Sequence, residues 1–147
     1  IKNSTILFMN ILFLCVGNSA RSQIAEALAK DMMPKSFDIR SAGSNPSKNV
    51  HKNAIRVMAD VGIDITNLKT KSIDSIDEDF INHLDYAITL CAEEICPVVP
   101  NATKVFHWPN EDPDNDRYNN LQLEQAFMKT RSDIFNLLKK FIVTENI

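Results

Sequence analysis

Glycine, proline and cysteine are all scarce in this chain, and each scarcity excludes a class of protein. The 147 residues include three glycines and six prolines, too few for long flexible linkers. The three cysteines are an odd number and do not make a disulfide framework, so free thiols and a cytoplasmic location are expected. No repeat or low-complexity tract divides the sequence. We expect one domain over residues 1–147, with residues 1–8 as a candidate extension.

Strong positive charge and long apolar runs are also missing. The net charge of −3 argues against a general affinity for nucleic acid, whose binding faces are strongly basic. The apolar stretch 6–16 is interrupted by Asn10 and is shorter than the ~20 residues of a membrane-spanning helix. We therefore expect no nucleic-acid partner and no membrane partner. A small anion site needs only a few donors, so it stays compatible with this charge.

Short apolar segments alternate with segments of helical periodicity. Strands are predicted near 10–15, 37–41, 86–90 and 103–106, and helices over 20–33, 54–61, the second half of 73–84, and 121–141. This alternation predicts an α/β fold, an open parallel four-stranded sheet with helices on both faces. Ligands of such sheets bind beyond the carboxyl ends of the strands, where Cys15, Ser41 and Cys91 are expected.

The strongest chemical signal follows the first predicted strand, in the segment Cys15-Val16-Gly17-Asn18-Ser19-Ala20-Arg21-Ser22. Such a turn can aim the backbone N–H groups of residues 16–22 at one tetrahedral oxyanion, and the helix start adds partial positive charge. Arg21 can hold two anion oxygens at once. The same field favours the thiolate form of Cys15, to which Ser22 can donate. We predict that Cys15 is a nucleophile, although a lone Cys-x5-Arg pattern also fits a buried structural cysteine.

A leaving oxide needs a proton, which a positioned carboxylic acid can supply. The predicted loop 107–120 contains Asp112 followed by Pro113, a pair that by itself indicates only a turn. Glu111, Asp114 and Asp116 lie close in sequence. The residues alone therefore do not choose the acid.

Together these segments resemble the low-molecular-weight protein tyrosine phosphatase superfamily. The likeness rests on Cys15–Arg21, and Arg21-Ser22-Gln23-Ile24-Ala25-Glu26 is similar to the arsenate reductase branch of the superfamily. Ser41-Ala42-Gly43, Gly62-Ile63-Asp64-Ile65 and Asp112-Pro113 follow in the expected order. The resemblance implies a low-molecular-weight phosphatase-like fold, arsenate or phosphate as the bound oxyanion, and Asp112 as the acid.

The resemblance also implies a redox role for Cys91 and Cys96. Cys15 would attack arsenic, and Cys91 would then attack Cys15 and release arsenite. Cys96 would move the disulfide to Cys91–Cys96, which a thioredoxin-like protein reduces. Four residues separate these cysteines, against six in the well-known thioredoxin-coupled members, so the order of exchange and the choice between thioredoxin and glutathione or glutaredoxin stay open. By residue type alone, both could be small buried side chains.

Helix geometry adds an expectation for this segment. A regular helix over 91–96 would separate the two Cα atoms by about 7.5 Å, whereas a disulfide allows at most ~6.8 Å. If the reduced segment is helical, it must unwind when the disulfide forms.

Two other functions fit part of the pattern. A phosphatase would use the same thiolate, but phosphatases of the superfamily typically carry paired tyrosines after Asp-Pro, where this chain has Asp114 and Asn115. A non-catalytic anion-binding module would not need an acid. The leading hypothesis is therefore arsenate reduction.

We expect no metal and no cofactor. The three histidines are scattered without ligand spacing. Some reductases of the superfamily bind a potassium ion, and Asn18, Glu26 and Ser41 match part of that site. Lys71 and Ser72, however, stand where an aspartate is expected.

Overall fold

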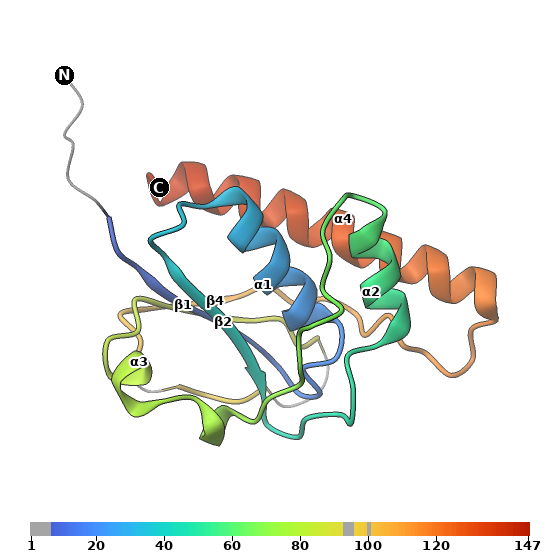
Figure 1. The fold of residues 1–147 in the computed structure, drawn as a ribbon, viewed down its shortest axis with the longest axis horizontal. Helices are drawn as coiled ribbons and strands as arrows, with labels where there is room; N and C mark the ends of the chain where they lie inside the picture. Colours follow the sequence, from blue (N-terminus) through green and yellow to red (C-terminus); the bar gives the residue numbers. More distant parts are fainter. Residues whose placement is uncertain (1–6, 93–95, 100) are drawn as a thin grey trace.

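Four parallel strands form the centre of the fold in the computed structural model, which describes residues 7–92, 96–99 and 101–147 (Figure 1). The strands are β1 (Asn10–Cys15), β2 (Asp38–Gly43), β3 (Tyr86–Thr89) and β4 (Lys104–His107). Their order across the sheet is β2-β1-β3-β4, and every neighbouring pair is parallel. The predicted four-stranded parallel sheet is confirmed. Residues 1–6 of the candidate extension lie outside the described residues.

The central strand β1 explains the apolar run that predicted it. It pairs with β2 on one side and β3 on the other, and residues 11–15 are buried. A strand enclosed in this way needs apolar side chains on both faces. β2 continues two residues beyond its predicted end because Ala42 pairs with Leu14 and Gly43 with Cys15.

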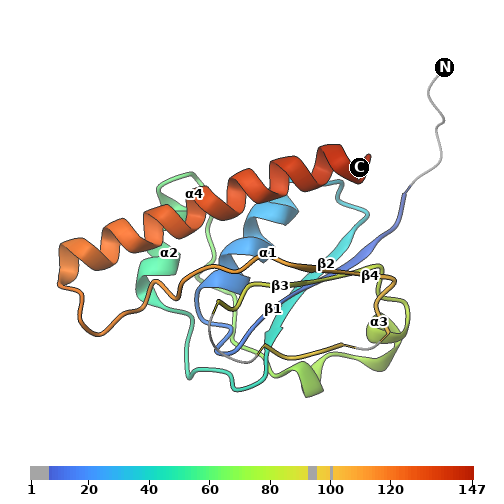
Figure 2. The same ribbon diagram turned by 180° about the vertical axis from the view of Figure 1, so that it is seen from behind.

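Helices cover both faces of the sheet, as predicted. α1 (Arg21–Met32), α2 (Lys52–Ala59) and α4 (Asn120–Thr144) lie on one face, while the short 3-10 turn η1 (Ile73–Ser75) and α3 (Glu78–Asn82) lie on the other (Figure 2). The larger apolar core lies under the three long helices. A smaller cluster, which includes Leu12, Phe80 and Leu84, fills the opposite face.

The predicted helix 54–61 ends earlier than its apolar pattern suggested. Val61 lies beyond α2 and is 48% exposed, so its assignment to the buried helix face was wrong. The chain turns here because Gly62 adopts a φ of +80°, a conformation that favours glycine.

α4 is fixed at its start and along its buried face. Asn119 and Gln122 form a capping box, and apolar side chains recur at helical spacing along the buried side. Near its end, Phe141 makes edge contacts with Phe106 and Trp108, with ring centroids 5.5 and 5.7 Å apart. Phe106 and Trp108 thus pack against the larger core as partly buried side chains. Among the described residues, no helix has the length and apolar character needed to cross a membrane.

Candidate active site

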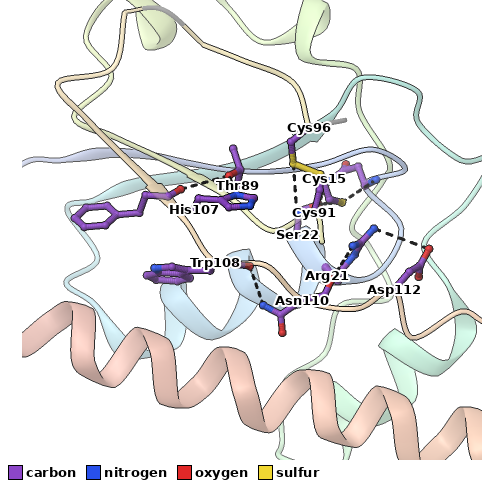
Figure 3. The surroundings of a disulfide bond; sticks show 12 residues. Cys15, Arg21, Ser22, Thr89, Cys91, Cys96, His107, Trp108, Asn110 and Asp112 are labelled. Atoms are coloured by element: carbon purple, nitrogen blue, oxygen red, sulfur yellow. Dashed lines mark hydrogen bonds and ion pairs between the residues drawn. A yellow bond between two sulfur atoms is a disulfide. The ribbon is translucent and has the colours of Figure 1, made fainter. Parts of the chain in front are cut away.

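The carboxyl ends of the strands bring the three cysteines to one edge of the sheet (Figure 3). Cys15 ends β1, and the Leu90 N–H donates to the Leu14 carbonyl on the neighbouring strand at 2.9 Å. By the strand register Leu90 lies level with Cys15, and Cys91 is one residue further along the same edge. The Asn110 N–H donates in turn to the Leu90 carbonyl at 3.1 Å, which brings the loop after β4 to the same edge.

The Cys15 sulfur lies at the base of the loop that joins β1 to α1, which we call the nucleophile loop (residues 15–22). The side chain is buried, and its Sγ lies 2.8 Å from the Ser22 Oγ and 3.2 Å from the Asn18 N–H nitrogen. Because the Asn18 Nδ2 donates to the Ser22 Oγ at 2.7 Å, the Ser22 hydroxyl can direct its own proton to the sulfur. Two donors aimed at one sulfur stabilise a thiolate.

Asn18 holds the shape of the nucleophile loop, a role that the sequence did not indicate. It is fully buried and has a φ of +51°, which asparagine tolerates better than most residues. Its Nδ2 also donates to the Ser41 Oγ at 3.0 Å, and its Oδ1 accepts from the Lys71 backbone at 2.9 Å and from the Gln23 Nε2 at 3.0 Å. These bonds tie the loop to β2 and to the segment before η1.

Arg21 begins α1 and faces the loop between β4 and α4, which we call the acid loop (residues 108–119). Its side chain is buried, and Nη1 donates to the Asn110 carbonyl at 2.9 Å. Its Nη2 lies 3.9 Å from the Asp112 Oδ2, and the Asp112 side chain is 51% exposed. The structure thus brings the predicted guanidinium and the predicted acid together. Asn110 was not predicted because it acts through its main chain.

Cys91 and Cys96 form a disulfide, and Cys15 is a free cysteine. The two Cα atoms lie 5.6 Å apart, and neither cysteine belongs to a helix. Cys91 is fully buried, whereas Cys96 is partly exposed and its Sγ accepts from the Cys91 N–H at 3.3 Å. Residues 93–95 lie outside the described residues, and the predicted unwinding of a reduced helix stays a prediction.

Glu26 is buried beside the nucleophile loop and is surrounded by cationic groups. It accepts from the Ser41 Oγ and from the Lys30 Nζ, each at 2.6 Å, and the Lys71 Nζ lies 3.9 Å away. Burial lowers the pKa of Lys71, although the charge of Glu26 opposes this effect. Two ammonium groups at Glu26 do not fit a bound potassium ion. The described part of the chain contains no group of three or more histidine, cysteine or acidic side chains placed to hold a metal.

Comparison with known proteins identifies the same family that the sequence motifs of the site resemble. The low molecular weight phosphotyrosine protein phosphatase pattern matches residues 10–142. The chain belongs to this family. An arsenate reductase of Oceanobacillus iheyensis is 38% identical over 136 residues, which are 91% of this chain and 95% of that protein.

Solved structures place the chain beside the reductases of the family. An arsenate reductase in its phosphate-binding state has a TM-score of 0.77 and 28% identity, and the match covers 92% of this chain and 98% of that one. The thioredoxin-dependent arsenate reductase of Corynebacterium glutamicum has a TM-score of 0.66 and 28% identity, over 96% of this chain and 64% of that one. The predicted likeness to arsenate reductases is confirmed.

Proposed function

We propose that this chain is a thiol-dependent arsenate reductase in which Cys15, Cys91 and Cys96 form a disulfide relay. The observation that carries the proposal is the Cys91–Cys96 disulfide next to a free, hydrogen-bonded Cys15. Hydrolysis of a phosphoester needs no second thiol. Reduction of arsenate needs two electrons, and a pair of thiols becoming a disulfide supplies them. The arsenate reductases among the relatives support the same reaction.

In the first step the Cys15 thiolate attacks arsenic and one oxygen departs as water. The backbone N–H groups of residues 16–22 and the guanidinium of Arg21 hold the remaining oxygens. Asp112 supplies the proton of the leaving group. This assigns Asp112, at the Arg21 side of the site, as the acid. The arsenic is still pentavalent, and it is bonded to the Cys15 sulfur.

In the second step the Cys91 thiolate attacks the Cys15 sulfur. The electron pair of the sulfur–arsenic bond stays on arsenic, which leaves as trivalent arsenite, and a Cys15–Cys91 disulfide forms. The Cys96 thiolate then attacks Cys91 and releases Cys15 as a thiolate. The products are the Cys91–Cys96 disulfide and a nucleophile ready for the next arsenate.

A dithiol protein of the thioredoxin class is the proposed reductant of the final disulfide. Cys96 is the partly exposed partner and Cys91 is fully buried, so an external thiolate reaches the Cys96 sulfur first. The thioredoxin-dependent relative supports this choice. Such a partner and free thiols suit the cytoplasm, which stays a prediction.

The proposal is tested by counting arsenite formed per enzyme with excess dithiol. We expect repeated turnover for the wild type, no arsenite for Cys15→Ser, and a decrease of about 10²-fold or more for Asp112→Asn. Asp116→Asn, in the same loop, is the matched control. Hydrolysis of aryl phosphates without any arsenite would instead identify a phosphatase.

A further inference from the structure

His51 links the nucleophile loop to the acid loop, although its sequence neighbourhood gave it no role. It is the N-cap of α2, and its Nδ1 accepts a hydrogen bond from the Asn53 N–H at 3.0 Å. Its own backbone N–H donates to the Ser19 carbonyl at 2.9 Å. One residue is therefore bonded both to the nucleophile loop and to the start of α2.

The other ring nitrogen points to the acid loop. The His51 Nε2 lies 3.3 Å from the Asp114 Oδ1, with 18% of the histidine side chain and 52% of the aspartate side chain exposed. Because Nδ1 accepts from Asn53, the ring proton lies on Nε2, the nitrogen that faces Asp114. The ring also packs on Phe127 of α4, with centroids 4.6 Å apart, which fixes its orientation.

Asp114 carries this contact onward to the predicted acid. Its backbone N–H donates to the Asp112 Oδ1 at 3.0 Å, and the other Asp112 oxygen lies 3.9 Å from Arg21. The contacts form a ring that runs from Ser19 through His51, Asp114 and Asp112 to Arg21, back in the nucleophile loop. One Asp112 oxygen thus accepts a hydrogen bond within this ring, and the other lies within ion-pair distance of Arg21.

The acid loop is packed against the rest of the protein only in part. A pocket of about 270 Å³ separates residues 110–113 from the facing side chains of α4. Asn110 and Pro113 of this loop are buried, whereas Asp112 and Asp114 are exposed, so the positions of the two carboxylates depend on their polar contacts.

We propose that His51 is a positioning residue. Its contact with Asp114, which we call the clasp, holds Asp112 at the proton-donating position. The inference deepens the proposed function, because it rests on Asp112 being the acid. A proton donor must lie within hydrogen-bond reach of the leaving oxygen, and small displacements reduce the rate steeply. Opening the clasp slows the chemical step and leaves arsenate binding by the nucleophile loop almost unchanged.

The test uses variants that separate the clasp from the helix cap. His51→Asn keeps an oxygen for the Asn53 N–H but is too short to reach Asp114, and asparagine is a good N-cap. Asp114→Ala removes the other partner. We expect each variant to decrease kcat about three- to tenfold with KM for arsenate within about twofold. The double variant should be no slower than the single ones, and the longer amide of His51→Gln should restore part of the rate.

The exposed pair His83 and Asp79, 3.4 Å apart on the far face of the sheet, offers a matched control. His83→Asn should leave kcat unchanged. Hydrogen–deuterium exchange of residues 110–118 should be faster in His51→Asn and Asp114→Ala, and unchanged in His83→Asn. Wild-type exchange and turnover in the clasp variants, or effects that multiply in the double variant, would overturn the proposal.

Asp112→Asn in the same assay tests the acid role of Asp112 separately from the positioning role of His51. If this variant turns over like the wild type, the acid assignment fails, and the positioning role fails with it. If it is slow while the clasp variants are fast, only the clasp is wrong. The exchange rates report on the clasp whichever result the turnover gives.

Discussion

The Ser22 hydroxyl lies 2.8 Å from the Cys15 sulfur and itself accepts a hydrogen bond from Asn18. When Cys15 is the thiolate that begins the reaction, the Ser22 hydroxyl is the donor in this contact. A hydrogen bond to a charged group contributes about 1.5 kcal/mol or more. Removing this bond should lower the reactivity of the Cys15 sulfur.

We predict that Ser22→Ala reacts several-fold more slowly with iodoacetamide at neutral pH. Cys91 and Cys96 are joined in the oxidised protein, so labelling followed by mass spectrometry reports on Cys15 alone. Ser36→Ala, which removes an exposed hydroxyl bonded to the Leu7 carbonyl, is the control. Equal rates for Ser22→Ala and the wild type would show that the hydroxyl does not support the thiolate.

Gly43 allows β2 to approach the nucleophile loop closely. A Cβ at this position would lie 3.0 Å from the Val16 carbonyl carbon and 3.1 Å from the Asn18 nitrogen, both of them main-chain atoms. We predict that Gly43→Ala lowers the free energy of unfolding by about 1–3 kcal/mol and also lowers turnover, because the loop must shift.

Gly17→Ala is the matched control for this prediction. Its added Cβ would meet only the Ser47 and Ser19 hydroxyls within 4 Å, and the nearer one, at 2.9 Å, belongs to a side chain that can rotate away. Urea denaturation measured on both variants checks the contrast in stability, and turnover is compared between Gly43→Ala and the wild type only, because Gly17 itself belongs to the oxyanion-binding loop. Similar losses for the two alanines would show that main-chain crowding at Gly43 is not the cause.

The hydroxyl of Tyr86, one of the two tyrosines in the chain, has a raised pKa. Burial and its hydrogen bond to Glu145 raise the pKa of Tyr86 to about 12. The neutral form is favoured in the folded state, so its contribution to stability is complete below pH 10 and is lost as the pH rises toward 12.

A near-ultraviolet absorbance titration should therefore show an ionisation near pH 12 in the wild type. It should be missing in Tyr86→Phe and kept in Tyr118→Phe. The stability advantage of the wild type over Tyr86→Phe should also shrink above pH 10. An ionisation of Tyr86 near pH 10, the ordinary tyrosine value, would contradict the burial of this hydroxyl.

Local pattern was enough to predict much of the fold and part of the site. The apolar run at 11–14 and the polar turn after it follow from burial of β1, and parallel strands necessarily place their carboxyl ends together. The encounter of Arg21 with Asp112 could be expected from the family resemblance. Its geometry could not, because the contact spans 91 residues and depends on how the acid loop folds.

Contacts made through the main chain or through isolated side chains left no signal in the sequence. Asn110 meets Arg21 with its carbonyl, which any residue would provide. His51 has no ligand spacing, yet the turn before α2 brings it to both loops. Val61 is exposed because the chain turns at Gly62, and the spacing of apolar residues gives no sign of that turn.

The cysteine relay is tested most directly by arsenate-dependent NADPH oxidation in the presence of thioredoxin and thioredoxin reductase. Wild type, Cys91→Ser and Cys96→Ser are compared at equal concentration, with Cys15→Ser as the blank. The relay predicts continuous oxidation for the wild type and one turnover or none for either single substitution. Continuous turnover that survives both substitutions would contradict it, because Cys91 and Cys96 would then be bystanders.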